Sequence, residues 1–192
     1  MSVQRVVTVV AAMSFVFGGA VGAATTEEEA LAKGRRVANV LSDTLRDQLA
    51  SNIQEKGVAE ALPQCYYQAL TVGKEIETTT GVKVKRISSR LRNQRNTPDA
   101  FEQEALARFE RFAKEGSMPT DELRREAIGG KPVFRYVKPI MVGSSCLRCH
   151  GDAKAIPQDV RHVLDEKYPE DKAIGYKEGD FRGLVSEVIP VE

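Results

Sequence analysis

GVKVKRISSRLR, residues 81–92, is the stretch at which the hydrophobic period of the chain changes. Upstream of it, apolar residues recur every three or four positions, as in amphipathic helices. Within it, Val82 and Val84 alternate with polar residues, and Ile87 and Leu91 continue the apolar series with an offset of one residue at Arg86. This pattern predicts a strand with a bulge at Arg86. Helices first and an antiparallel sheet afterwards indicate the α+β class.

Three helices are predicted around this stretch. The first begins after Thr26, which forms a capping box with Glu29, and it ends at Gly57. The second covers residues 58–76, and Pro63 should kink or restart it just before Cys65. The third runs from residue 98 to residue 116 and carries an apolar face.

The second half of the chain predicts the sheet. A strand is expected over residues 131–142, and a short helix over residues 157–169. The segment AIGYKEGDFRGLVSEVIPV, residues 173–191, suggests two strands joined by a turn at residues 177–180.

CLRCH, residues 146–150, has the spacing used for covalent haem attachment, with Cys146 and Cys149 as thioether positions and His150 as an iron ligand. A zinc site is the first alternative, but beyond this motif the chain offers only Cys65 and His162 as further soft ligands. A thioredoxin-type site is the second, and it would need a βαβ pattern that the sequence lacks. The motif therefore indicates one haem c.

The N-terminus agrees with attachment after export. Residues 1–23 combine an early Arg5, an apolar run and small residues before a cut near Ala23 or Ala24, which is the layout of a secretory signal. An uncleaved membrane anchor is the alternative, although the strongly apolar part is short for a span of about 20 residues. We expect a periplasmic protein with a single domain over residues 24–192.

The charge balance excludes one class of partner. The chain has 28 Lys and Arg against 27 Asp and Glu, a net charge of +1. Nucleic-acid binding needs a basic excess, and none is present.

Four segments resemble a family of exported c-type haem domains with a PAS-like fold, which occur alone or as the sensor part of histidine kinases. They are GVAEALPQCYYQA (57–69), VKRISSRLRNQRNTPDAFE (84–102), CLRCHGD (146–152) and YPEDKAIGYKEGDFRGLVSEVIP (168–190). The resemblance implies a PAS-like antiparallel sheet with flanking helices and a haem held between His150 and Cys65. Gln94 departs from the family pattern, where proline is expected, and could alter a turn.

The residues alone leave the second axial ligand open. Cys65 is the one cysteine outside CLRCH, and a free thiol is often only a small buried side chain. The alternatives are Met118, Met141 and His162. Arg90 and Arg92 are candidate contacts for the haem propionates, because guanidinium groups pair with carboxylates.

Three classes of function compete for such a protein. A free-standing exported haem domain suggests electron transfer or redox sensing with an unidentified redox partner protein or membrane sensor. The alternative is a haem-based gas or redox sensor that signals through a separate partner. An enzyme is not expected, because catalysis at haem needs an open iron position and polar groups beside it.

Overall fold

The computed structural model describes residues 25–191, apart from the side chains of Cys65 and Tyr66. The predicted signal peptide, residues 1–23, lies outside the described residues, so it stays a prediction. No helix in the described part of the chain is long and apolar enough to cross a membrane.

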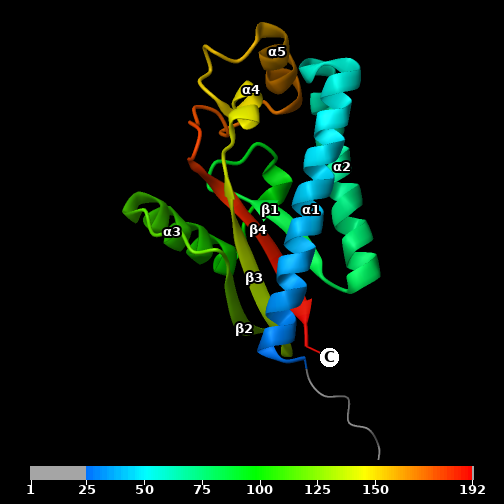
Figure 1. Ribbon diagram of the computed structural model, residues 1–192, viewed down its shortest axis with the longest axis vertical. Helices are drawn as coiled ribbons and strands as arrows, with labels where there is room; N and C mark the ends of the chain where they lie inside the picture. The colour runs from blue at the N-terminus through cyan, green and yellow to red at the C-terminus, as the bar shows by residue number, and fades with distance from the viewer. Residues whose placement is uncertain (1–24, 192) are drawn as a thin grey trace, which may run out of the picture.

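A four-stranded antiparallel sheet forms the centre of the molecule (Figure 1). Its strands are β1 (Lys83–Ile87), β2 (Glu122–Ile128), β3 (Lys131–Met141) and β4 (Phe181–Pro190). They lie in the order β1-β4-β3-β2, so the first strand pairs with the last. With the helices, this sheet confirms the α+β prediction.

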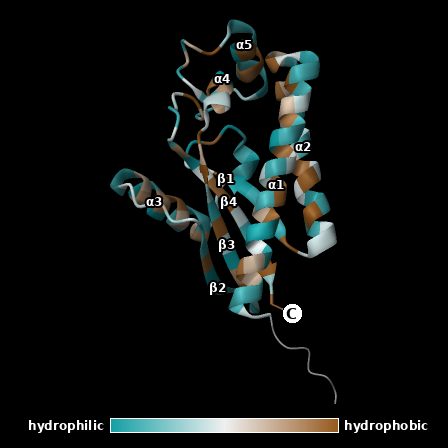
Figure 2. Ribbon diagram, viewed as in Figure 1, coloured by the Kyte–Doolittle hydropathy of each residue, from teal (hydrophilic) through white to brown (hydrophobic). Residues whose placement is uncertain are grey.

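Helices α1 (Glu27–Lys56) and α2 (Val58–Thr80) form a hairpin that covers one face of the sheet. The predicted capping box of Thr26 and Glu29 is present, and Gly57 ends α1 with a positive φ of 84°. Figure 2 shows hydrophobic and hydrophilic residues alternating along α1, as expected for a helix that buries one side. Gly34 lets α1 approach the sheet closely, because a Cβ there would lie 2.6 Å from the ring of Tyr136. Helix α2 does not restart at Pro63.

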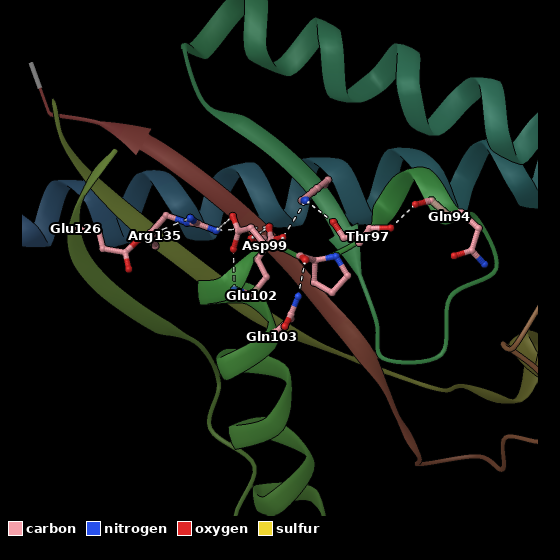
Figure 3. A network of polar contacts seen from close by, with 10 residues as sticks. Gln94, Thr97, Asp99, Glu102, Gln103, Glu126 and Arg135 are labelled. Atoms are coloured by element: carbon pink, nitrogen blue, oxygen red, sulfur yellow. Dashed lines mark hydrogen bonds and ion pairs between the residues drawn. The ribbon is translucent and has the colours of Figure 1, made fainter. Parts of the chain in front are cut away.

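Helix α3 (Ala100–Glu115) lies on the other face and is tied to the sheet by charge (Figure 3). Glu102, 2% exposed, accepts hydrogen bonds from Ser186 Oγ at 2.7 Å and the Asp99 backbone N–H at 2.8 Å. It also pairs with Lys85 Nζ at 2.8 Å, and Arg135 on β3 pairs with Asp99 at 2.8 Å. The network fixes the start of α3 across three of the four strands.

The remaining helices gather at one end of the sheet, beside the turn between α1 and α2 (Figure 1). Strand β3 leads into the short helices η2 (Ser144–Cys146) and α4 (Leu147–His150), and α5 (Gln158–Lys167) follows. A further short helix, η1 (Gln94–Asn96), lies between β1 and α3.

Two predictions about the sheet are wrong, and one strand is missing from them. The strand at residues 83–87 has a regular register with β4, so there is no bulge at Arg86; the irregularity is in β3, between Ile140 and Met141. Strand β2 was not predicted at all. The C-terminal segment contains one strand, β4, because residues 173–176 bond to the CLRCH motif instead of to a neighbouring strand.

One carboxylic acid is buried in the apolar layer under α1 and α2. Glu187 on β4 has no exposed surface and lies opposite Tyr136 of β3 and Val84 of β1. Neither carboxyl oxygen has a hydrogen-bond partner among the described residues. Burial disfavours the charged form and raises the pKa of Glu187 to about 9, against a small opposing effect of Lys138.

Candidate haem site

A cavity of about 640 Å³ opens between the helical hairpin and the end of the sheet that carries α4. Its wall is largely apolar. The apolar lining comes from α1, α2 and β3 and from the segments that follow β1 and β3, and it includes Leu41, Leu45, Leu49, Ile53, Leu62, Ala69, Leu70, Leu91, Ile140 and Val142. A cavity of this size and character is typical of a site for a large organic cofactor.

The CLRCH motif forms part of this wall. Cys146, Cys149 and His150 all line the cavity, and all three are partly buried. The turn of helix is closed by Gly151, whose backbone N–H donates to Leu147 O at 3.0 Å. The motif therefore presents two thiols and one imidazole to the same space.

The hydrogen bond made by His150 defines its tautomer. Nδ1 lies 2.7 Å from the carbonyl oxygen of Ala173. A carbonyl oxygen can only accept, so Nδ1 carries the proton and Nε2 keeps its lone pair. Burial, together with the nearby guanidinium groups of Arg92 and Arg182, lowers the pKa of His150 to about 3. The imidazole is therefore neutral at physiological pH, which is the form that binds metals.

A segment that we call the strap, residues 171–176, is hydrogen-bonded to the end of the motif. Its backbone donates from Gly175 N to Gly151 O at 2.6 Å and from Tyr176 N to His150 O at 2.9 Å. At its start, Lys172 N donates to Leu91 O at 2.8 Å. The strap thus joins the loop after β1 to the CLRCH turn and supplies the acceptor for His150.

Tyr176 closes the strap against His150. The two rings meet edge to face with centroids 6.3 Å apart. The guanidinium of Arg90 lies 4.1 Å from the Tyr176 ring centre and that of Arg182 lies 5.2 Å from it, so cations stack on the tyrosine. Arg90 Nε also donates to Lys172 O at 3.1 Å.

Basic side chains dominate the charged part of the cavity wall. They are Lys74, Lys83, Lys85, Arg86, Arg92, Arg148 and Arg182, against the single acid Glu77 among the described lining residues. Burial lowers the pKa of Arg182, whose Nη1 donates to Ser88 Oγ at 2.6 Å. Such a wall favours an anionic ligand.

The predicted propionate contacts differ in position. Arg92 lines the cavity, whereas Arg90 is not among its lining residues and stacks on Tyr176. Propionate contact stays a prediction for both, and Arg86, Arg148 and Arg182 join Arg92 as arginines in the wall.

The candidates for the second axial ligand fall in different places. Cys65 is in α2, three residues after Leu62 and four before Ala69, both of which line the cavity, but its side chain lies outside the described part. Met141 lines the cavity. Met118 packs under α3 on the opposite face of the sheet, and His162 is exposed on α5. The fold therefore places Met141 and the part of α2 that contains Cys65 beside the cavity, and it leaves Met118 and His162 away from it; ligation by Cys65 stays a prediction.

The residues present fit a haem. The macrocycle is flat and apolar and carries two propionates, and the cavity combines an apolar wall with arginines, two adjacent thiols and an imidazole whose Nε2 is available. A zinc site would need at least three clustered ligands. No three His, Cys, Asp or Glu side chains gather in that way over the described residues.

Sequence reasoning missed the strap and Arg182. Asp171 is two residues before Ala173, and at this spacing an aspartate side chain often accepts a hydrogen bond from the backbone N–H. This spacing was the signal in the sequence for an irregular segment. The alternating pattern of residues 173–176 pointed instead to a strand.

Comparisons with known proteins agree with this site. The model of a protein family described as Tll0287-like matches residues 23–190. A similar solved structure is the crystal structure of the cyanobacterial heme-protein Tll0287, with 28% sequence identity and a TM-score of 0.64, covering 86% of this chain and 96% of that chain. None of the curated proteins matches the chain.

Proposed function

Because this chain belongs to the Tll0287-like family, we propose that it is an exported c-type cytochrome with one covalent haem that acts in electron transfer or redox sensing. One observation carries the proposal. Cys146, Cys149 and His150 line a single apolar cavity, and the hydrogen bond from Nδ1 to Ala173 O leaves His150 Nε2 for iron. The haem of the cyanobacterial heme-protein supports the same cofactor here.

Haem would supply one-electron chemistry, and the chain would hold and tune it. The proposed roles are thioether bonds from Cys146 and Cys149 and axial ligation by His150 and Cys65. The arginines in the wall would pair with the propionates. If His150 and Cys65 both bound the iron, it would keep no open position for a substrate, so we propose no catalytic activity.

Absorption spectra of the purified holoprotein test this function. We expect a low-spin ferric spectrum, a reversible reductive titration and little CO binding by the ferrous form. The redox partner would then be a separate protein. Immediate CO binding to the ferrous form would contradict the carrier and favour a haem-based gas sensor, and irreversible reduction would contradict both redox roles.

The substitution Cys65→Ala should raise the midpoint potential and make the ferric form bind added imidazole or cyanide. A thiolate is an anionic donor that favours ferric over ferrous iron, so its loss stabilises the reduced form. The measurement is a potentiometric titration with ferric spectra before and after ligand addition.

Met141→Leu is the matched control, because Met141 also lines the cavity. It should leave the spectrum and the potential of the parent in place. If Cys65→Ala resembles the parent and Met141→Leu does not, the axial ligand is Met141.

A further inference from the structure

The backbone at Ala173 is held by hydrogen bonds with Asp171 and Arg92. The proposed function does not use these hydrogen bonds. We propose that Asp171 and Arg92 are positioning residues for His150: together they hold the strap so that the Ala173 carbonyl accepts the hydrogen bond from Nδ1–H, and Nε2 keeps the lone pair that would bind iron. The inference rests on the proposed haem function for its redox consequence, but not for the geometry of the imidazole.

Asp171 fixes the backbone that leads into the acceptor, the carbonyl of Ala173. Its Oδ1 accepts from the backbone N–H of Ala173 at 2.7 Å, and its own N–H donates to Tyr168 O at 2.9 Å. The side chain is only 10% exposed. An aspartate that bonds to the second residue after it imposes a defined turn, and this turn aims the Ala173 carbonyl at the imidazole.

Arg92 joins this turn to the haem motif. Its Nε donates to Asp171 Oδ2 at 3.0 Å, and its Nη2 donates to Cys149 O at 2.5 Å. The same Nη2 lies 3.4 Å from Ala173 O, so Arg92 and His150 share one acceptor. One planar guanidinium thus sets the distance between the CLRCH turn and the strap, a role that the flexible ammonium of lysine cannot fill.

The pair has an electrical consequence as well as a geometric one. The side chain of Arg92 is 12% exposed, so its charge is weakly screened by water and is balanced by Asp171. Removing the carboxylate takes one negative charge away from beside the iron ligand. This loss favours the ferrous form, so the midpoint potential should rise.

Asp171→Ala removes both the turn and the balancing charge. In the ¹⁵N NMR spectrum of the apoprotein, His150 should change from a single Nδ1–H tautomer to a mixture. In the ferrous holoprotein, the Nδ1 proton should exchange with solvent about tenfold faster, because its hydrogen bond is loosened. The midpoint potential should move upward.

Asp171→Asn separates the turn from the ion pair: it keeps an oxygen that accepts from Ala173 N–H, but it replaces Oδ2 with an NH2 group and so removes the charge together with the hydrogen bond from Arg92 Nε. It should retain the single tautomer and still raise the midpoint potential. It also serves as the test if Asp171→Ala does not fold. A midpoint potential equal to that of the parent would overturn the electrostatic role of Asp171.

Asp121→Ala is the matched control. Asp121 is 8% exposed and pairs with Arg35 at 2.7 Å, but it does not line the haem cavity. It should lower the melting temperature and leave the tautomer, the exchange rate and the potential unchanged. If Asp171→Ala also changes only the melting temperature, the Arg92–Asp171 ion pair is merely structural and the proposal is wrong. Because the tautomer is read in the apoprotein, failure of the redox function would not affect that result.

Discussion

Haem should stay on the chain through denaturing electrophoresis when the protein is made in a host that matures c-type cytochromes. Cys146 and Cys149 lie on one wall of the cavity, at the spacing that suits two thioether bonds to one haem. Haem-dependent peroxidase staining of the gel and the intact mass, equal to the processed chain plus one haem, are the measurements.

Substitutions in the motif should separate attachment from ligation. The double variant Cys146→Ser with Cys149→Ser should lose all covalent haem. His150→Ala should keep haem on the chain but lose the low-spin spectrum, because it removes a ligand and not a thioether. Cys65→Ala is the control, since it removes the third cysteine and should keep its covalent haem. Extraction of haem from the parent protein by acidified solvent would show that the motif does not attach it.

Glu187→Gln should stabilise the protein at neutral pH and flatten its dependence on pH. The folded state holds Glu187 with a pKa of about 9, above the ordinary value of 4.5. Protonated Glu187 therefore makes its full contribution to the unfolding free energy below pH 4.5. This contribution is lost as the pH rises towards 9. Between pH 4.5 and 7 the parent should lose about 3 kcal/mol of unfolding free energy on this account.

The measurement is denaturant unfolding of the haem-loaded parent and variant at several pH values. The difference in unfolding free energy between the two should grow from pH 5 to pH 8, because only the parent loses stability through Glu187. The other titrating groups are the same in both proteins and cancel in the comparison. Glu102→Gln offers a contrast: Glu102 is buried but bonded to Ser186, Lys85 and Asp99, so its loss should destabilise the protein at neutral pH. Parallel pH curves for the parent and Glu187→Gln would contradict the expected titration.

Local chemistry made some elements predictable. Thr26 and Glu29 cap α1 through contacts three residues apart, and the covalent spacing of CLRCH is equally local. Strand β2 gave no such signal, since it is an edge strand whose exposed Arg124 and Arg125 interrupt the apolar alternation.

The site was predictable only in part, because its other half depends on distant contacts. Arg92 meets Asp171, 79 positions along the chain, and Arg90 stacks on Tyr176. The periodicity of hydrophobic residues along the sequence does not indicate such distant contacts. The cysteines and His150 follow from their spacing, whereas the residues that orient them follow from the fold.

The strand order determines when the sheet can be completed during folding. In the described sheet β1 is bonded to β4 alone, and β4 ends at Pro190, so the edge formed by β1 must wait until the last strand has been synthesised. CLRCH lies before the strap and β4 in the chain, so a chain that folds after export can expose the motif until these two segments have docked. Pairing between such remote segments is slow, since the intervening loop must close first. Under the proposed function, this topology would leave an interval after export in which both thiols are accessible for haem attachment before β4 completes the sheet beside them.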